Sequence, residues 1–321
     1  MATELAPHTN TAAPATLSAA ALEYAKASRS PATLAAYRRD FTHFTSWCRD
    51  RGESAIPATP EVVAEYLTDL AAEFKPSTIA RRLAAVSVAH QSGGYDTPTR
   101  HPAVRAVNTG IRRTHGTAPK EAAALSIGEI RRMIARVDRN TLHGKRDVAI
   151  ILAGFALAAR PSELVAMEVV DITRSSEGLT VRVRHNKRDQ EGRGAERVIV
   201  AGTDVETCPI IALGEWLAAA AIESGPVFRS VTRHGHVGDR ALSTNSVTAV
   251  LKQRAAAADL DTTRLSGHSL RVSHVTTAAA NGRPEREIAA QTLHAPGSLV
   301  LRRYIRHGSR FTENSAKHLG L

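Results

Sequence analysis

The sequence predicts a mainly α-helical protein of two domains, an all-α first domain and a mixed α+β second domain with a small antiparallel sheet. Three observations support this prediction. Helix start signals recur early in the chain, a segment without apolar periodicity follows at residues 116–124, and apolar and polar residues alternate around residues 179–200. The 321 residues suffice for two domains and a sizeable core in at least one.

Three helices are expected in the first domain. Ser30 is a suitable N-cap and Pro31 follows at the first helical position, and the pair Thr59-Pro60 repeats this arrangement. Apolar residues then recur on one face of each segment. A third helix is expected over residues 77–91, because two glycines follow it closely.

The second domain is expected to begin with a helix near residue 125. Ser126 and Glu129 have the spacing of a capping box, and Leu125 with Ile130 suits a hydrophobic staple. The start of the chain is rich in Ala, Thr and Pro, which is typical of a disordered tail. The predicted divisions are a disordered tail at residues 1–17, a helical domain at 18–115, a linker at 116–124 and a second domain at 125–321.

Two segments organise the second domain. The apolar run of 12 residues from Val148 to Ala159 is too short to span a bilayer and predicts a buried core helix. Leu179–Arg184 alternates strictly and Glu196–Val200 in part, which predicts a β-hairpin with a long polar, glycine-rich tip. From about Ile210 the pattern returns to helix.

Composition indicates a polyanionic partner. The chain has 42 Lys and Arg against 31 Asp and Glu, a net charge of +11, and basic surfaces gain affinity for nucleic acid by releasing counterions. No signal peptide, lipidation signal or basic amphipathic anchor is recognised, so no membrane partner is expected. Cys48 and Cys208 lie far apart, which predicts neither a disulfide framework nor a zinc site. We expect a soluble, cytoplasmic protein associated with the nucleoid.

Tyr304 is the most informative residue, because it lies among three arginines near the end of the chain. A phenol beside guanidinium groups suits attack on a phosphodiester. His268 and Arg271 are three residues apart, on one face of a helix, which suits a phosphate with an adjacent proton transfer. The other candidates are Arg160 and Glu163 after the apolar helix, Lys187 at the hairpin tip and His294.

Some of the candidates also have a purely structural explanation. Val300, Leu301, Tyr304 and Ile305 recur at helical spacing, so Tyr304 could be a core residue of an amphipathic helix. Arg160 could simply pair with Glu163 at the rim of the buried helix. Lys187 could be ordinary solvated charge.

Taken in order, these residues resemble the tyrosine recombinase (phage integrase) family. The order Arg, Lys, His-x-x-Arg, His, Tyr is that of the family, and Arg160-Pro-Ser-Glu-Leu164 resembles its first arginine motif. Residues Gly267–Val272 and Tyr304–Arg306 look most like the Cre-type branch. Ser30-Pro-x-Thr-x-x-x-Tyr37 resembles the start of the family's core-binding domain, so the resemblance extends from about there to the C-terminus.

The resemblance implies both a fold and a reaction. The first domain would be a SAM-like core-binding domain and the second a catalytic domain of the tyrosine recombinase type. Tyr304 would attack the scissile phosphate to form a 3′-phosphotyrosyl link, and strand exchange would pass through a Holliday junction. Arg160 and Arg271 would clamp the non-bridging oxygens, for which forked guanidiniums are well suited. No metal and no nucleotide cofactor are expected.

Further roles follow from the same resemblance. Lys187 would protonate the leaving 5′-oxygen, His268 would assist removal of the proton from Tyr304, and Glu163 would orient a neighbouring arginine or histidine. His294 would be the second histidine of the family pattern. Here Leu293 replaces the usual glycine, and His294 lies ten positions before Tyr304, one more than in the family. A loop containing Pro296 and Gly297 is expected to absorb the extra residue. 

The resemblance also implies how DNA is held. The helix over residues 77–91 is expected to enter a major groove, with Arg81 and Arg82 exposed opposite its apolar face and Lys75 and Thr78 near its start. The partner would be double-stranded DNA with a specific, palindromic target. A homo-tetramer would assemble on two such sites, with the tail Gly308–Leu321 docked on a neighbouring protomer.

Three other functions stand as alternatives. A catalytically inactive DNA-binding or architectural protein would keep the fold without the reaction. A type IB topoisomerase-like enzyme would share the chemistry but relax supercoils as a monomer. A metal-dependent nuclease would need clustered carboxylates, and the sequence has none with convincing spacing.

Overall fold

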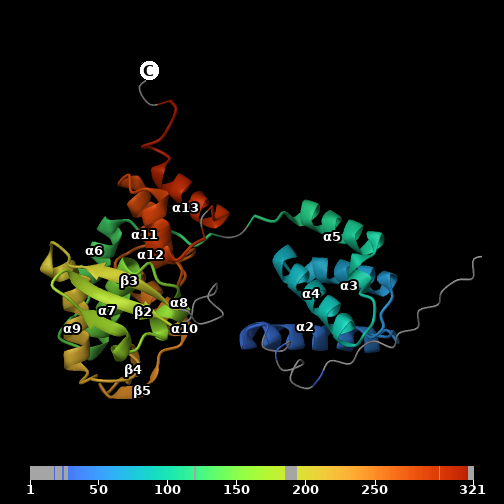
Figure 1. The fold of residues 1–321 in the computed structure, drawn as a ribbon, viewed down its shortest axis with the longest axis horizontal. Helices are drawn as coiled ribbons and strands as arrows, with labels where there is room; N and C mark the ends of the chain where they lie inside the picture. The colour runs from blue at the N-terminus through green and yellow to red at the C-terminus, as the bar shows by residue number, and fades with distance from the viewer. Residues whose placement is uncertain are drawn as a thin grey trace, which may run out of the picture. The chain divides into compact units, whose positions relative to one another are not determined.

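The computed structural model describes residues 18, 24, 28–118, 121–184, 194–295 and 297–316. Helices predominate and the strands form two small antiparallel sheets, which confirms the predicted fold class (Figure 1). The chain divides between residues 119 and 120 into two compact units, each with its own apolar cores. No helix in the described part of the chain is long and apolar enough to cross a membrane.

Within residues 28–118 the first unit is entirely helical. Its helices are α2 (Pro31–Arg49), α3 (Pro60–Glu73), α4 (Pro76–Ser92), the 3-10 turn η1 (Pro98–Arg100) and α5 (Pro102–His115). The predicted caps are present: Ser30 Oγ accepts the Thr33 amide at 3.2 Å, and Thr59 caps α3 in the same way. Phe44, Tyr66 and Ile79 bring α2, α3 and α4 together in one fully buried cluster.

Helix α5 was not predicted from the sequence. Its N-cap is His101, whose ring nitrogen Nδ1 accepts the Ala103 amide at 3.3 Å, in place of the usual Ser, Thr, Asp or Asn. Val104 and Ile111 are its only buried residues, so the apolar stripe is too sparse to recognise.

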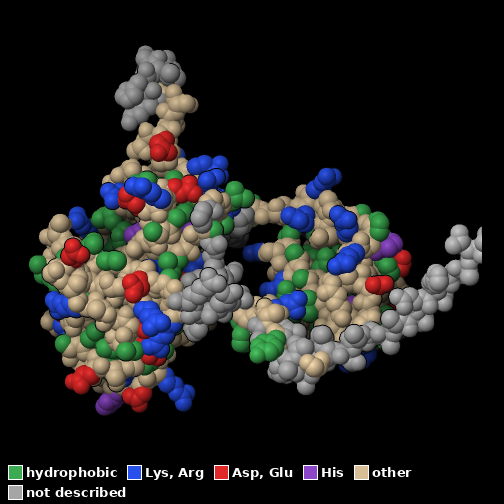
Figure 2. Space-filling view, viewed as in Figure 1, with side chains coloured by type: hydrophobic (Ala, Val, Ile, Leu, Met, Phe, Trp, Pro, Cys, Tyr) green, Lys and Arg blue, Asp and Glu red, His purple; other side chains and the backbone are tan. Residues whose placement is uncertain are grey.

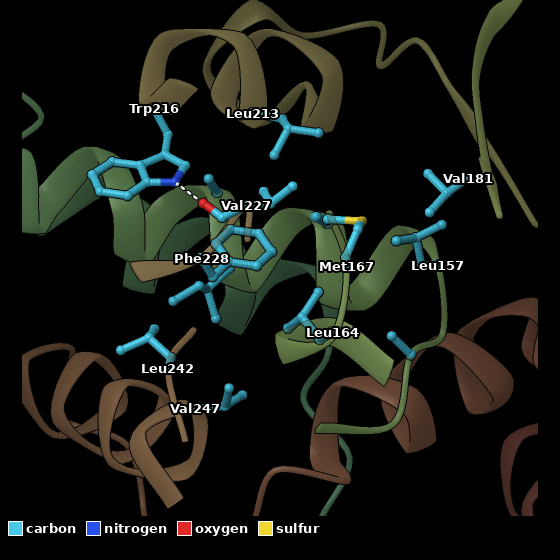
Figure 3. Packing of buried hydrophobic residues seen from close by; sticks show 14 of the residues in the cluster. Leu157, Leu164, Met167, Val181, Leu213, Trp216, Val227, Phe228, Leu242 and Val247 are labelled. Atoms are coloured by element: carbon cyan, nitrogen blue, oxygen red, sulfur yellow. Dashed lines mark hydrogen bonds between the residues drawn. The ribbon is translucent and has the colours of Figure 1, made fainter. Parts of the chain in front are cut away.

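The second unit surrounds a central buried helix. Its helices are α6 (Ile127–Ala135), α7 (Leu142–Ala156), α8 (Pro161–Val165), η2 (Val169–Asp171), η3 (Val205–Thr207), α9 (Pro209–Ala219), α10 (Thr244–Ala257), α11 (Ser269–Ala280), α12 (Glu285–Thr292) and α13 (Leu299–Ser309). Residues 148–154 of α7 are all buried, as the apolar run predicts. Trp216 on α9 closes the main core by donating its indole N–H to the Val227 carbonyl at 2.8 Å, beside Phe228 and Met167 (Figure 3).

Two sheets flank this core. Strands β1 (Ile172–Arg174), β2 (Gly178–Val183) and β3 (Ala195–Val200) are antiparallel in that order, and β2 and β3 form the predicted hairpin. The tip, residues 185–193, lies outside the described residues. Helices α7 and α9 pack against β3.

The expectation that only helix follows residue 210 is wrong. Strands β4 (Arg229–Val231) and β5 (Val237–Ala241) form a second hairpin there. Both strands are short, β5 is mostly exposed, and the turn uses Gly235 with a φ of 81°. A strand without a buried face leaves no apolar alternation in the sequence, which explains the error.

The capping box of α6 offers a test of local stability. Ser126 Oγ accepts the Glu129 amide at 3.2 Å, and Glu129 Oε2 accepts the Ser126 amide at 2.7 Å. Ser126→Ala should lower the free energy of unfolding of the second unit by about 1 kcal/mol. Urea titration of the full chain would measure it, with Ser92→Ala at the end of α4 as the control. An effect no larger than that of the control would contradict the assignment.

Candidate active site

Glu163 is the centre of the candidate site. It lies on α8, whose first residue follows Arg160, and Glu163 Oε2 accepts the Arg160 backbone amide at 2.8 Å. The other oxygen, Oε1, forms an ion pair with the Arg160 guanidinium. Ala158, with a φ of 46°, turns the chain from α7 into this short helix. Glu163 therefore caps α8 and holds the Arg160 side chain at once.

Arg271 approaches the same carboxylate from α11. It is 5% exposed, and its Nη1 donates to the Ala158 carbonyl at 2.7 Å and lies 4.0 Å from Glu163 Oε2. Its Nη2 donates to the Thr292 carbonyl. Burial lowers the pKa of Arg271 to about 9, and repulsion by Arg160 acts in the same direction. A pKa of about 9 still leaves this guanidinium charged at neutral pH.

A third arginine, Arg197 on β3, was not among the predicted site residues. Its Nη2 lies 2.9 Å from Glu163 Oε2, and the residue is 2% exposed. Burial also lowers the pKa of Arg197, although Glu163 opposes this shift. Arg197 lies in a segment where apolar and polar residues alternate, and this pattern is the sequence signal that could have indicated a role for it.

The charges of this cluster do not balance. Burial alone would raise the pKa of Glu163, but attraction to Arg197 and Arg160 outweighs it, so its pKa lies below the usual value and the carboxylate is ionised at neutral pH. The guanidiniums of Arg160, Arg197 and Arg271 thus surround the single carboxylate of Glu163. Buried charge is costly unless it is compensated, so the cluster is suited to bind an anion.

His294 lies beside Arg271 despite its altered spacing. The Arg271 Nη2 atom is 3.3 Å from His294 Nε2, and His294 Nδ1 is 2.7 Å from Thr292 Oγ1. Leu293 ends α12 in the left-handed conformation, with φ 52° and ψ 43°, and the His294 amide donates to the Ala289 carbonyl. The backbone thus adopts the conformation that favours the family's glycine while a leucine occupies the position.

His268 is exposed at the N-cap of α11, one turn before Arg271. The start of this helix lies close to α8: a Cβ atom on Gly267 would be 2.5 Å from Pro161 Cγ. The Gly267 amide also donates to Thr248 Oγ1 at 3.0 Å. Glycine at this position therefore allows α8 and α11 to approach each other.

Tyr304 lies half-buried on α13, against an apolar cluster that includes Val275 and Leu301. Its electrostatic interaction with Arg271 is one of the factors that raise the pKa of that arginine. Helix α13 packs closely on α11, since a Cβ atom on Gly308 would lie 2.4 Å from the Thr276 carbonyl oxygen. Tyr304 therefore contributes to the apolar packing of α13 and also interacts electrostatically with Arg271, so a role in packing does not conflict with a role in the reaction.

The structure brings together Arg160, Glu163, Arg271 and His294, and adds Arg197 to them. Lys187 and the neighbouring Arg188 lie outside the described residues, so the predicted role of the lysine stays a prediction. Among the residues that the structure describes, no group of three or more His, Cys, Asp or Glu side chains could hold a metal ion.

The predicted exposure of Arg82 in the first unit is wrong. Arg82 is 8% exposed, its guanidinium lies 3.9 Å from the centre of the Phe74 ring, and Nη1 is 3.0 Å from His43 Nε2. Stacking of the guanidinium on the Phe74 ring compensates the free-energy cost of burying it. The sequence pattern predicts exposure because Arg82 lies opposite the apolar face of the helix. Arg81 is 43% exposed in its side chain and donates to the buried Asp40 at 2.6 Å.

The other predicted DNA-contact residues face outward to different degrees. Lys75 is exposed at the N-cap of α4, and Thr78 is half-buried one turn later. Further basic side chains gather over α5, which carries exposed Arg105, Arg112 and Arg113, and others over α13 (Figure 2).

Comparison with known proteins identifies the family. Residues 124–310 match the phage integrase family, and residues 22–92 match the phage integrase N-terminal SAM-like domain. This chain belongs to the phage integrase family. It is a tyrosine recombinase, an enzyme of site-specific DNA recombination.

Three similar proteins illustrate the relationship. An integrase/recombinase xerD homolog of Selenomonas ruminantium is 35% identical, covering 91% of this chain and 86% of the relative. The recombinase Cre of Escherichia phage P1 is 24% identical over 64% of this chain and 61% of its own length. A lambda integrase tetramer bound to a Holliday junction, solved by crystallography, shares the fold, with a TM-score of 0.58 and 16% identity over 89% of this chain and 75% of that one. The Cre-type branch stays a prediction.

Leu293 provides a test of the strained turn before His294. Leu293→Gly should make the second unit more stable than Leu293→Ala by about 1 kcal/mol, because only glycine adopts a positive φ without steric cost. The alanine variant is the matched control, since it loses the same side-chain contacts but keeps the Cβ atom. Urea denaturation of the two variants would measure the difference, and equal stability would argue against a left-handed residue 293.

Proposed function

We propose that this recombinase cuts and rejoins DNA strands through a 3′-phosphotyrosyl intermediate formed on Tyr304. One observation carries the proposal: the guanidiniums of Arg160, Arg197 and Arg271, with side chains 15%, 1% and 6% exposed, lie around the single carboxylate of Glu163, which leaves a positive charge that a phosphodiester would neutralise. A dry site with preorganised positive charge stabilises the additional negative charge that develops on phosphorus oxygens in the transition state.

Two of the arginines would contact the phosphate directly. Arg160 lies at the start of α8 with 15% of its side chain exposed, and Arg271 lies one turn after the exposed N-cap residue His268 of α11. Each guanidinium would donate to a non-bridging oxygen of the scissile phosphate. Glu163 would fix Arg160 by its paired contacts to the backbone amide and the side chain. His294, beside Arg271, would add a further hydrogen bond to the same phosphate.

The reaction needs two proton transfers. The phenol oxygen of Tyr304 attacks phosphorus, the bond from phosphorus to the 5′-oxygen breaks, and the DNA 3′ end becomes attached to the protein. His268 would accept the phenol proton, and Lys187 would give a proton to the leaving 5′-oxygen. Rejoining reverses these transfers with the 5′-hydroxyl of a partner strand. The arginines supply the positive charge, so the proposed steps include no metal ion.

Assembly on DNA is proposed from the likeness to lambda integrase, whose tetramer was solved on a Holliday junction. We infer that four copies of this chain bind two copies of a palindromic site on double-stranded DNA and exchange strands through such a junction. Helix α4 would lie in a major groove, with Lys75, Thr78 and Arg81 toward the DNA and Arg82 supporting Arg81 through Asp40. The protein would act in the cytoplasm, at the nucleoid.

The decisive experiment uses nicked suicide DNA that carries a site obtained by binding selection. Wild-type protein, with EDTA present throughout, should form a denaturation-resistant protein–DNA adduct, and Tyr304→Phe should form none while binding the DNA with the same affinity. Arg271→Lys should lower the rate of adduct formation by about 100-fold, because an ammonium cannot replace the guanidinium fork.

The alternatives give other results. Binding by both proteins without an adduct would favour an architectural protein of the same fold. Cleavage that EDTA abolishes would favour metal-dependent chemistry. Relaxation of supercoiled plasmids that lack the selected site, by a monomer, would favour a topoisomerase-like activity.

A further inference from the structure

Strand β3 buries an arginine and exposes valines. Arg197 and Ile199 face the core, 2% and 0% exposed, whereas Val198 and Val200 face outward, 47% and 68% exposed. A shift of the strand by one residue would bury both valines and free the arginine. The pairing of Arg197 with the buried Val181 of β2 shows that the arginine is held in the core register.

Arg197 has few partners for a buried cation. Its Nη2 lies 2.9 Å from Glu163 Oε2 and 3.5 Å from the Thr292 carbonyl oxygen, and its Nε is buried without a hydrogen-bond partner. A cavity of about 220 Å³ lies on the Arg197 and Glu163 side of α8, lined also by Leu157 and Val181. Neutralising Glu163 does not require Arg197, since Arg160 already pairs with that carboxylate.

The contacts of Glu163 show how Arg197 affects the distance between Arg271 and this carboxylate. Glu163 Oε2 accepts the Arg160 backbone amide at 2.8 Å and lies 2.9 Å from Arg197 Nη2, so both directions of this oxygen are occupied. Arg271 Nη1 remains at 4.0 Å from the same atom and donates instead to the Ala158 carbonyl. Without Arg197, Oε2 would have room for Arg271 to close into a direct ion pair.

We propose that Arg197 is a positioning residue of the active site, which occupies Glu163 so that Arg271 stays available to the phosphate. The proposal rests on the function proposed above. Arg197 would also steady the Thr292 carbonyl, which it shares with Arg271 and which precedes His294. Its role is thus to set the direction of Arg271 without touching the DNA.

The test compares adduct formation in single turnover by wild type, Arg197→Met and Arg197→Lys on the same suicide DNA. Arg197→Met should form the adduct about 10- to 100-fold more slowly with DNA affinity unchanged, a loss of the size found when the hydrogen-bond partner that orients a metal ligand is removed. Arg197→Lys keeps the charge but not the fork and should fall between the two. Arg146→Gln is the matched control: Arg146 is also buried and paired with a carboxylate, Asp147, outside the cluster.

A second substrate separates positioning from damage to the fold. A neutral methylphosphonate at the scissile position carries less charge for the arginines to hold, so the rate difference between wild type and Arg197→Met should shrink to about threefold or less. An equal loss on both substrates, or a wild-type rate for Arg197→Met on the phosphodiester, would overturn the proposal. If Arg197→Met does not fold, by circular dichroism, the ratio of the two substrates for Arg197→Lys decides in its place.

The outcomes also separate this proposal from the proposed function. Absence of any adduct with wild type would reject the phosphotyrosyl reaction itself. An adduct with wild type that is insensitive to Arg197 substitution would reject only the positioning role.

Discussion

The carboxylate of Glu163 is the point on which the second unit depends. It caps α8 through the Arg160 amide, pairs with the Arg160 side chain, forms an ion pair with Arg197 of β3 and lies 4.0 Å from Arg271 of α11. Segments separated by more than a hundred residues thus meet at one charged group. Because a buried carboxylate has a fixed number of lone-pair directions, each arginine constrains the others. The geometry of the candidate site and the local stability of the fold therefore depend on the same contacts.

Elements with a local signal could be predicted from the sequence. The caps at Ser30 and Thr59, the capping box at Ser126 and the apolar run of α7 depend on neighbouring residues, and the structure confirms all of them. Helix α5 and the β4–β5 hairpin depend on tertiary packing, with few buried positions of their own. The candidate site residues were recognised from their order along the chain, which does not show how their side chains meet.

The buried arginines mark the limit of such reasoning. Charge predicts exposure, which places Arg82 in solvent and gives no reason to include Arg197 in the site, yet each is buried beside a carboxylate, Asp40 or Glu163. Strand β3 reverses the usual pattern, in which apolar residues face the core: its valines Val198 and Val200 are exposed and Arg197 is buried. Local rules tend to fail where a site has to be held in a particular geometry.

The close contact of α13 with α11 has a consequence for the division of roles among subunits in the proposed assembly. Gly308 lies against the Thr276 backbone, and Leu301 is fully buried. Helix α13, which carries Tyr304, is therefore packed tightly on α11, which carries Arg271. The proposed nucleophile, Tyr304, and the proposed phosphate-binding Arg271 consequently lie on helices of the same polypeptide that pack against each other. In the proposed assembly each copy would carry its own complete site, so control over which strand is cut would act on the copies individually.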